Sequence, residues 1–546
     1  MRIPTRADPG ARMAELRFTG RVASGGFAAG PLAILASSAG RTRGAGDPTT
    51  EAQALRDAIA SALGQLSDLA AGADSDGADI LAFQIAMLED ETLAEPAFGV
   101  IKVGASADRA WRTALDEQIS EYETTEDENF RARASDLRDI RDRVLGALSG
   151  AASDAPLPSG YIVVGEDLTP SRFLATDWSG GGGIALTRGS ASGHVATLAR
   201  ARGVPMIVGL GFDLAGAAQQ TEALIDSESA TLCLDPEAAT WETFAARARA
   251  AGRSRDAANA FRMRPAFTAD GTRIAVFINI ADPNEVETLD PACCDGIGLV
   301  RTEFLFNHGL PDQETQYRIY RRLAEWASGK PVTIRTLDAG ADKPIPGLTL
   351  EHEANPFLGL RGIRLSLAKP EPFRTQLEAV CRAAVHGAVE VMLPMVALPR
   401  ELESARGHLE EAIAGLRAAG VPYRRPELGI MVEVPAAAIE VAAFDAAFFS
   451  IGSNDLTQYV MAAARDSDAV AALNEPSHPA VLRLIAQVAA HGARVGRKVS
   501  LCGDAGGEPK HIEALLAAGV RALSVSPAAL GRAKEAIARV DLRSGG

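Results

Sequence analysis

The spacing of hydrophobic residues changes several times along this chain of 546 residues. Short apolar runs alternate with small residues over positions 14–36, a pattern that predicts short strands. From Glu51 to about Leu148 the apolar residues recur every three or four positions, which predicts roughly four amphipathic helices. Helices of this number are enough for a small bundle, which would be inserted into another domain.

The segment from Pro156 to Pro236 returns to short apolar runs between helical stretches, which predicts an α/β domain. Its predicted strands cover residues 161–164, 183–186, 206–208 and 230–234. The segment 237–262 is rich in Ala and Arg and contains no Pro, so it predicts one connecting helix.

Beyond about Ala266, apolar runs and helical stretches alternate regularly. The predicted strands cover residues 273–280, 296–300, 332–337, 389–393, 428–432, 447–451, 499–502 and 522–525. Eight strands that alternate with helices in this way indicate a (β/α)₈ TIM barrel. The predicted fold class is therefore an α/β multidomain protein with a C-terminal barrel.

These patterns predict six segments. The first is a disordered tail, because Arg2, Arg6 and Arg12 surround no apolar core that could serve as a signal peptide. The predicted boundaries are a tail at 1–13, the first strands of the α/β domain at 14–40, the helical insert at 41–150, the rest of the α/β domain at 151–236, the linker helix at 237–262 and the barrel at 263–546.

Charge and cysteine content narrow the possible functions. The net charge of −15 argues against partners such as nucleic acid or an anionic membrane surface. None of the five cysteines forms a C-x-x-C pair, so a disulfide framework is not expected and a reducing, cytoplasmic setting is. No apolar run approaches the length of a membrane span.

His194 lies where a glycine-rich stretch leads into a predicted helix. The first N–H groups of a helix have no partner inside the helix, and together with the helix dipole they attract phosphate. An imidazole is nucleophilic near neutral pH, so this position suits a phosphoryl carrier. Taken alone, this segment fits a phosphoryl carrier and a structural histidine that packs against a neighbouring loop equally well.

Charged and reactive residues follow the predicted barrel strands, where the reacting groups of such barrels lie. Arginines can bind phosphate and carboxylate, and carboxylates suit Mg²⁺. A small, highly anionic, metal-chelating ligand is therefore expected. Taken singly, each arginine could form a structural salt bridge and the cysteine could be a buried apolar residue. The charged and reactive residues that follow the predicted strands are Arg301, Arg335, Arg361, Glu433, Asn454, Asp455, Arg465 and Cys502.

Several motifs resemble enzyme I of the phosphoenolpyruvate-dependent sugar phosphotransferase system. On the barrel these are 298–306 (GLVRTEFLF), 355–361 (NPFLGLR), 429–435 (GIMVEVP) and 452–456 (GSNDL). Nearer the N-terminus they are 87–90 (MLED), 138–140 (RDI) and 167–171 (DLTPS). The resemblance extends from about residue 16 to the C-terminus, although related pyruvate–phosphate enzymes share several of the barrel motifs.

The resemblance implies a swivelling phosphohistidine domain in which His194 accepts the phosphoryl group of phosphoenolpyruvate. It implies that Cys502 protonates the enolate to pyruvate, and that Glu433 and Asp455 bind Mg²⁺. The substrate would be held by Arg301, Arg335, Asn454, Asp455 and Arg465, with Arg361 in support. It also implies that the helical insert docks a small HPr-like phosphocarrier protein, and that the protein is a cytoplasmic homodimer joined through its barrels.

The chain departs from the family pattern at a few positions. The Thr-Ser pair that usually precedes the histidine is Ser192-Gly193 here, so one hydroxyl is lost. Ala464 replaces an acidic residue before Arg465, and Asp504 replaces the usual Glu. Sugar uptake, nitrogen signalling and dihydroxyacetone phosphorylation all remain open as the branch that the protein serves.

Two other functions, an ATP-dependent dikinase and a non-catalytic sensor, are compatible with parts of the sequence. A dikinase that uses ATP shares the histidine domain and the barrel, but the segment before His194 has no G-x-x-x-x-G-K loop. A regulatory protein that senses phosphoenolpyruvate without catalysis is compatible with the altered histidine flank. The reactive set on the barrel argues against a sensor, because a sensor has no need of a proton donor such as Cys502.

Overall fold

The computed structural model describes residues 14–35, 44, 46–72, 75–124, 128–150, 157–189, 191, 193–211, 221–306, 309–340, 345, 348–349, 353, 355–465 and 468–543. The predicted tail at 1–13 lies outside these residues. The chain divides into two compact units, Met1–Gly252 and Arg253–Gly546. The division falls inside one long helix, α8 (Ala238–Arg262), which occupies the segment rich in Ala and Arg.

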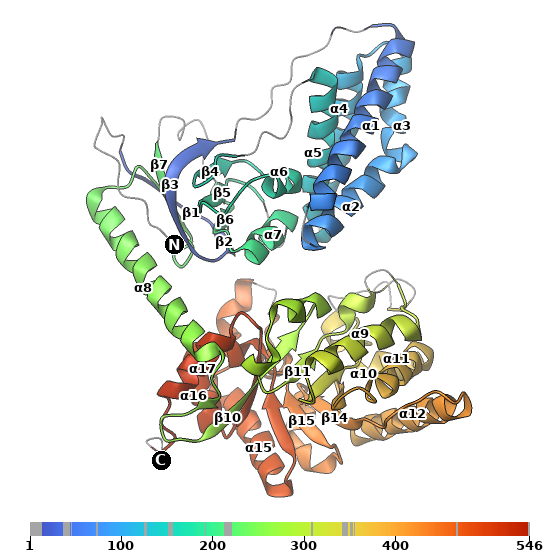
Figure 1. Ribbon diagram of the computed structural model, residues 1–546, viewed down its shortest axis with the longest axis vertical. Coiled ribbons are helices and arrows are strands. Elements are labelled where there is room, and N and C mark those ends of the chain that lie inside the picture. The colour runs from blue at the N-terminus through green and yellow to red at the C-terminus, as the bar shows by residue number, and fades with distance from the viewer. Residues whose placement is uncertain are drawn as a thin grey trace. The chain divides into compact units, whose positions relative to one another are not determined.

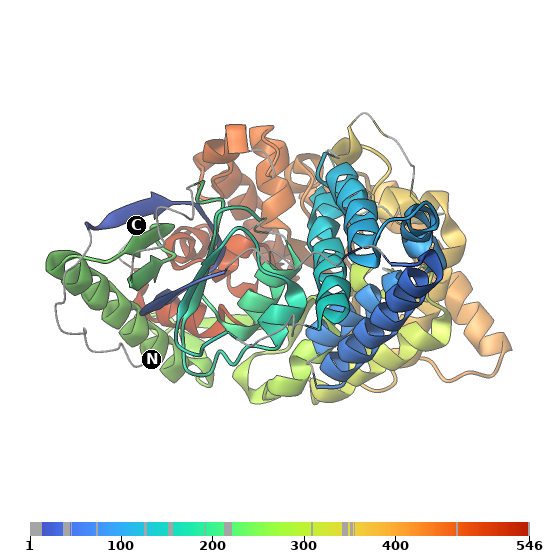
Figure 2. The same ribbon diagram turned by 90° about the horizontal axis from the view of Figure 1, so that it is seen from above.

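A bundle of helices forms one part of the first unit (Figures 1 and 2). The described residues contain five such helices where roughly four were predicted. The additional helix is α3, which begins after Asp90, whose side chain accepts a hydrogen bond from the Thr92 N–H. The five are α1 (Pro48–Gly72), α2 (Ser75–Glu89), α3 (Glu91–Lys102), α4 (Ala107–Thr124) and α5 (Glu128–Ser149).

The rest of the first unit is a mixed eight-stranded sheet in the order β1-β8-β7-β3-β4-β5-β6-β2. Gly20 alone joins β1 to β2, which lie at opposite ends of this order, so the sheet curls round on itself. A Cβ at Gly20 would lie 2.5 Å from the Val208 carbonyl oxygen, which explains the glycine at this bend. The strands are β1 (Leu16–Thr19), β2 (Arg21–Ser24), β3 (Phe27–Ile34), β4 (Ile162–Gly165), β5 (Gly183–Leu186), β6 (Met206–Val208), β7 (Glu222–Asp226) and β8 (Thr231–Leu234).

Two helices connect strands of this sheet and pack beside it, α6 (Pro170–Leu174) and α7 (His194–Arg202). Between β5 and β6 the chain passes through α7, and both strands run parallel to one another. This is the crossover connection that parallel strands require, and His194 is the first residue of its helix.

The second unit is a closed parallel barrel, as predicted (Figure 1). Each strand pairs in parallel with the next along the chain, and β17 pairs with β10 to close the ring. A short strand, β9 (Ala266–Phe267), pairs antiparallel with β10. The barrel strands are β10 (Arg273–Ile280), β11 (Ile297–Val300), β12 (Val332–Arg335), β13 (Val389–Leu393), β14 (Glu427–Val432), β15 (Phe448–Ile451), β16 (Lys498–Leu501) and β17 (Ala522–Val525).

Helices surround these strands, and most of them begin with a proline in the first turn, where the missing N–H costs nothing. They are α9 (Gln313–Trp326), α10 (Ile363–Ala368), α11 (Pro370–Ala383), α12 (Pro399–Ala418), α13 (Pro435–Ile439), α14 (Ser453–Met461), α15 (Pro479–Val495), α16 (Pro509–Ala517) and α17 (Leu530–Arg539). Among the helices that the structure describes, none is long and apolar enough to cross a membrane.

Candidate active site

A cavity of about 300 Å³ opens among the residues that follow the barrel strands. Its volume is within the range of small-molecule sites. All the barrel residues predicted to act on the ligand line this cavity: Arg301, Arg335, Arg361, Glu433, Asn454, Asp455, Arg465 and Cys502. The structure therefore brings together side chains that lie as far apart as 201 positions in the sequence.

Arg335 and Arg361 are buried and held by carboxylates. Arg335 contacts Glu303 at 2.6 Å and Asp338 at 3.1 Å. Arg361 forms two hydrogen bonds to each of two carboxylates, Asp338 at 3.0 and 3.1 Å and Asp455 at 3.1 and 3.2 Å. Burial by itself lowers the pKa of Arg361, but the two carboxylates raise this pKa by more than burial lowers it. The guanidinium therefore stays charged. Arg361 is thus a rigid support for the acidic residues.

Arg301 differs from these two arginines. Its backbone N–H donates to the Ile280 carbonyl, but no ion pair or side-chain hydrogen bond joins its guanidinium to any residue in the described ranges. The side chain lines the cavity and is half-buried. A guanidinium in this state can bind an anionic ligand without first breaking an internal ion pair. Arg465 is exposed and lines the same cavity.

Glu433 lines the cavity and is 1% exposed. Its Oε1 accepts a hydrogen bond of 2.6 Å from the Met395 N–H. Burial, followed by the charges of Asp455 and Asp338, raises the pKa of Glu433 to about 8. Gly452 leaves room for this side chain, since a Cβ there would lie 2.8 Å from its Oε2.

The acidic residues of this cavity fit a divalent cation. Asp455 and Glu433 contribute the hard carboxylate oxygens that Mg²⁺ prefers, and Mg²⁺ commonly uses one or two carboxylates together with oxygens of the substrate. In the part of the chain that the structure describes, no group of three or more His, Cys, Asp or Glu side chains could hold a metal ion.

Cys502 follows β16 and is 2% exposed. Its thiol donates to the Ile451 carbonyl oxygen at 3.6 Å. Burial raises the pKa of Cys502 to about 11, with the Glu433 charge adding to the rise and a hydrogen bond from Ser450 opposing it. The thiol is therefore protonated at neutral pH and carries a proton that it can donate to a ligand in the cavity.

Asn454 is held in place by the residue that departs from the family pattern. Its amide nitrogen donates to the Asp504 carboxylate at 2.9 Å, and its amide oxygen accepts from the Asp504 N–H at 3.0 Å. This pair of hydrogen bonds uses both the donor and the acceptor of the Asn454 amide and so fixes the orientation of that side chain. Aspartate at position 504 thus has a defined role in the cavity wall.

His194 is the first residue of α7, in the first unit. Gly193 precedes the helix in an extended conformation and makes no side-chain cap, so no side chain of that residue covers the start of the helix. The His194 side chain is 34% exposed. Ser192, the other half of the departure before the histidine, lies outside the described residues.

Asp136 on α5 contacts His194, and no motif in the sequence points to this contact directly. The Nδ1 atom of His194 lies 3.1 Å from Oδ1 and 3.0 Å from Oδ2 of Asp136, whose side chain is completely buried. Gln84 on α2 also donates to Asp136 at 3.2 Å. The neighbouring motif at 138–140 was the nearest available signal, since Asp139 accepts two hydrogen bonds from Ser171.

Three family models together match most of the chain. They are described as the N-terminal part of PEP-utilising enzymes, which matches residues 19–133, their mobile domain, which matches residues 157–230, and their PEP-binding domain, which matches residues 255–542. The last of these alone covers more than half of the sequence.

Similar proteins of known name cover nearly the same range. One from Haloferax volcanii, named phosphoenolpyruvate-protein phosphotransferase, is 38% identical over 84% of this chain and 81% of its own length. Proteins of the same name from Geobacillus stearothermophilus and Staphylococcus carnosus are 37% and 34% identical, over 83% and 85% of this chain and 79% and 82% of theirs. The chain therefore belongs to the phosphoenolpyruvate-protein phosphotransferase family, the enzyme I family that its motifs resemble.

Proposed function

We propose that this protein transfers the phosphoryl group of phosphoenolpyruvate to His194 and then to a histidine of an HPr-like phosphocarrier protein, releasing pyruvate. The observation that carries the proposal is the barrel cavity. It combines an arginine that has no ion pair among the described residues, two carboxylates suited to Mg²⁺ and a protonated thiol, in a chain of this family. Phosphoryl transfer depends mainly on positioning and charge neutralisation, which such a set provides.

In the proposed reaction the bond between phosphorus and the bridging oxygen of phosphoenolpyruvate breaks, and a bond forms from His194 to phosphorus. The oxygen keeps the electron pair and leaves as the enolate of pyruvate. Cys502 then gives its thiol proton to the methylene carbon of the enolate, and solvent restores the proton on sulfur. Arg301 and Arg465 bind the phosphoryl group, while Arg335 and Asn454 complete the substrate contacts.

Glu433 and Asp455 are the proposed Mg²⁺ ligands. When bound, Mg²⁺ would neutralise negative charge on the substrate and polarise its oxygens. The residues themselves contribute the rest of the arrangement, because Arg361 fixes the Asp455 carboxylate and the Met395 N–H fixes that of Glu433.

The contact with Asp136 selects the reactive nitrogen of His194. A carboxylate accepts hydrogen bonds, so it favours the tautomer with the proton on Nδ1 and the lone pair on Nε2. We therefore assign Nε2 as the atom that attacks phosphorus. Asp136 also stabilises the positive charge that the imidazole gains as the new bond forms.

Replacing Asp136 with Ala is expected to slow phosphorylation of His194 by phosphoenolpyruvate at least about tenfold, because the tautomer and the ring orientation are no longer fixed. Rapid-quench measurement of the phosphoprotein checks this. Asp116→Ala is the matched control, since Asp116 lies in the same bundle and pairs with Arg141 instead of the histidine. Equal rates for Asp136→Ala and the unmodified protein would remove Asp136 from the mechanism.

Cys502→Ala is expected to retain phosphoenolpyruvate binding but to form pyruvate about 100-fold more slowly, the lower range for a general acid. A coupled assay with lactate dehydrogenase measures pyruvate. Cys381→Ala controls for the loss of a buried thiol, because Cys381 lies on α11 and is also buried. An unchanged rate of pyruvate formation in Cys502→Ala would contradict the assignment, and Cys381→Ala is expected to keep the rate of the unmodified protein.

The proposed function also requires a partner protein and a movement of one domain. The helical insert at 41–150 would dock the phosphocarrier, and the linker helix at 237–262 would let the phosphohistidine domain at 151–236 move between the carrier and the barrel at 263–546. A cytoplasmic homodimer joined through the barrels completes the proposal, consistent with five free cysteines in the described residues.

The proposed function is tested by mixing the purified protein with phosphoenolpyruvate and Mg²⁺ in the absence of ATP. A burst of about one pyruvate per chain, followed by slow turnover until a carrier is added, is expected from transfer to a single histidine. A burst that needs ATP would favour the dikinase instead. Binding of phosphoenolpyruvate with no burst would favour the sensor.

A further inference from the structure

A chain of buried polar side chains runs through the wall of the barrel and ends at the substrate cavity. It begins on α9, where Gln316 donates to the Pro311 carbonyl at 3.2 Å and accepts from the Tyr320 hydroxyl at 3.1 Å. Tyr320 accepts in turn from Gln376 on α11, at 3.0 Å. All three side chains are no more than 1% exposed, so water does not compete for these hydrogen bonds.

Gln376 connects this chain to the two loops that follow β11 and β12. Its amide oxygen accepts from the Leu337 N–H at 3.0 Å, in the loop after β12. Its amide nitrogen also donates to the Thr302 hydroxyl at 3.2 Å, in the loop after β11. Thr302 passes the connection on, since its hydroxyl donates to the Arg335 carbonyl at 3.0 Å.

The residues held in this way are neighbours of the proposed substrate contacts. Thr302 lies between Arg301 and Glu303, and Leu337 lies between Arg335 and Asp338. Glu303 also accepts from the Asp338 N–H at 3.3 Å, besides its ion pair with Arg335. Gln376 itself does not line the substrate cavity, but it joins the two segments that carry the cavity residues Arg301, Arg335 and Asp338.

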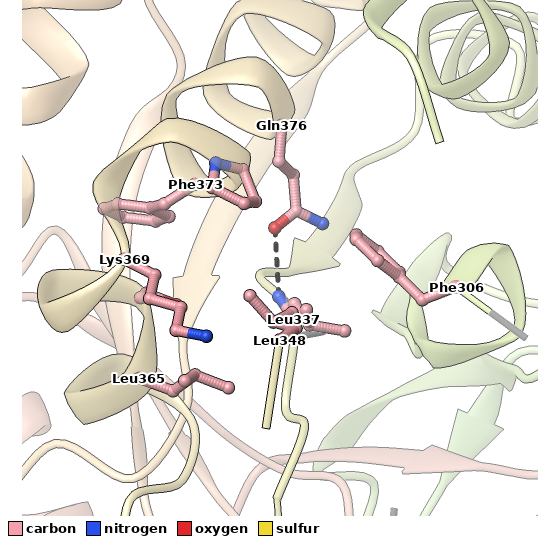
Figure 3. Close-up of a pocket in the computed structure, with 9 residues that line it drawn as sticks. Phe306, Leu337, Leu348, Leu365, Lys369, Phe373 and Gln376 are labelled. Atoms are coloured by element: carbon pink, nitrogen blue, oxygen red, sulfur yellow. Dashed lines mark hydrogen bonds between the residues drawn. The ribbon is translucent and has the colours of Figure 1, made fainter. Parts of the chain in front are cut away.

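The donors and acceptors of this network have one consistent arrangement. The Leu337 N–H can only donate, so it fixes the Gln376 oxygen and leaves the amide nitrogen facing two hydroxyls. Those hydroxyls must then donate onward, to the Arg335 carbonyl and to Gln316. Figure 3 shows the Gln376 amide aimed at Leu337 beside a small cavity with apolar walls, including Phe306, Leu348 and Phe373. Hydrogen bonds in such surroundings are strong, and a missing partner is costly.

We propose that Gln376 is a positioning residue for phosphoenolpyruvate binding: through Leu337 and Thr302 it holds Arg335, at the end of β12, and Arg301, just after β11, in the geometry that receives the substrate. The proposal rests on the proposed function. It assigns a role to a side chain that does not line the substrate cavity and lies 41 positions after Arg335 in the sequence. Without the bridge the arginines remain present, but their spacing is no longer set before the substrate arrives.

The test compares Gln376→Leu with Gln316→Leu in the full chain carrying His194→Ala, so that phosphoenolpyruvate binds without being consumed. Both variants remove a buried glutamine from the same hydrogen-bonded chain, but only Gln376 contacts Leu337 and Thr302, which lie beside the arginines. Calorimetric titration with phosphoenolpyruvate and Mg²⁺ gives the Kd, and thermal unfolding gives the Tm. Gln376→Leu is expected to raise the Kd about tenfold. Gln316→Leu is expected to lower the Tm similarly and leave the Kd within about twofold.

Thr302→Val supplies a second variant, because valine has nearly the shape of threonine and loses only the hydroxyl that reaches the Arg335 carbonyl. It is expected to raise the Kd about threefold with little change in fold. Equal Kd values for all variants, or equal increases for Gln376→Leu and Gln316→Leu, would overturn the positioning role. If Gln376→Leu does not fold, an unchanged Kd in Thr302→Val overturns it alone. A parent chain that binds no phosphoenolpyruvate would instead refute the proposed function.

Discussion

Replacement of His194 with Ala is expected to abolish phosphoryl uptake from phosphoenolpyruvate while leaving the binding of phosphoenolpyruvate to the barrel unchanged. His194 lies in the unit Met1–Gly252, whereas every other predicted site residue lines the cavity in Arg253–Gly546. The nucleophile and the substrate site are therefore separate in the fold, and loss of the imidazole removes the acceptor without altering any cavity wall. Transfer of radiolabel from phosphoenolpyruvate to the protein and calorimetric binding together measure the two effects.

The control for this variant is His408→Ala, which removes a partly exposed imidazole on α12 that pairs with Glu411. It is expected to take up one phosphoryl group like the unmodified protein. Two results would contradict the account: labelling that persists in His194→Ala, or loss of phosphoenolpyruvate binding in that variant. The first would place the acceptor elsewhere, and the second would mean that the two functions are not divided between the two units.

Asp455→Ala is expected to lower kcat/KM for phosphoenolpyruvate by about 100-fold or more, the size typical for loss of one preorganised electrostatic group. The change removes one of the two carboxylates proposed to hold Mg²⁺. It also leaves Arg361 with a single carboxylate partner, Asp338. Steady-state pyruvate production at increasing Mg²⁺ concentration is the measurement, and the Mg²⁺ concentration needed for half-maximal rate should rise.

Two further variants separate the roles of Asp455. Asp338→Ala also takes a carboxylate from Arg361 but removes no proposed metal ligand, so its Mg²⁺ requirement should stay near that of the unmodified protein. Asp445→Ala removes a carboxylate that is 82% exposed and lies just before β15, and it should have normal activity. Normal turnover in Asp455→Ala would place the metal ion elsewhere.

The barrel could be predicted from sequence because its strands are buried on both faces. Such strands are nearly continuous apolar runs, which a reader of the sequence can find without any knowledge of their partners. The strands at Arg273–Ile280 and Val389–Leu393 have the bounds that were predicted. The run predicted at 332–337 ends as a strand at Arg335, because the chain turns there into the loop that carries Asp338.

The cavity residues could be predicted for a related reason. In a barrel the groups that follow each strand share one rim, so Arg301, Glu433 and Cys502 were expected to meet although they are distant in sequence. The spacing along the strands supplied the geometry, and the residue types supplied the chemistry. The number of helices in the insert was underestimated, because α3 is short and its start depends on one capping aspartate, Asp90.

Asp136 and Gln376 could not be found in the same way. Asp136 reaches His194 across 58 positions, and Gln376 reaches Thr302 across 74. Both are polar residues on amphipathic helices, where a polar position normally indicates a solvent-facing side. Only the packing of those helices against other elements turns the two side chains inward, and local periodicity carries no record of that packing.

The most direct test of the central claim is the intact mass of the protein after incubation with phosphoenolpyruvate and Mg²⁺, without ATP. The account predicts the mass of one added phosphoryl group per chain, lost on acid treatment and missing from His194→Ala. An unchanged mass in the presence of bound phosphoenolpyruvate would contradict phosphoryl transfer to His194 and would leave the barrel as a binding site alone.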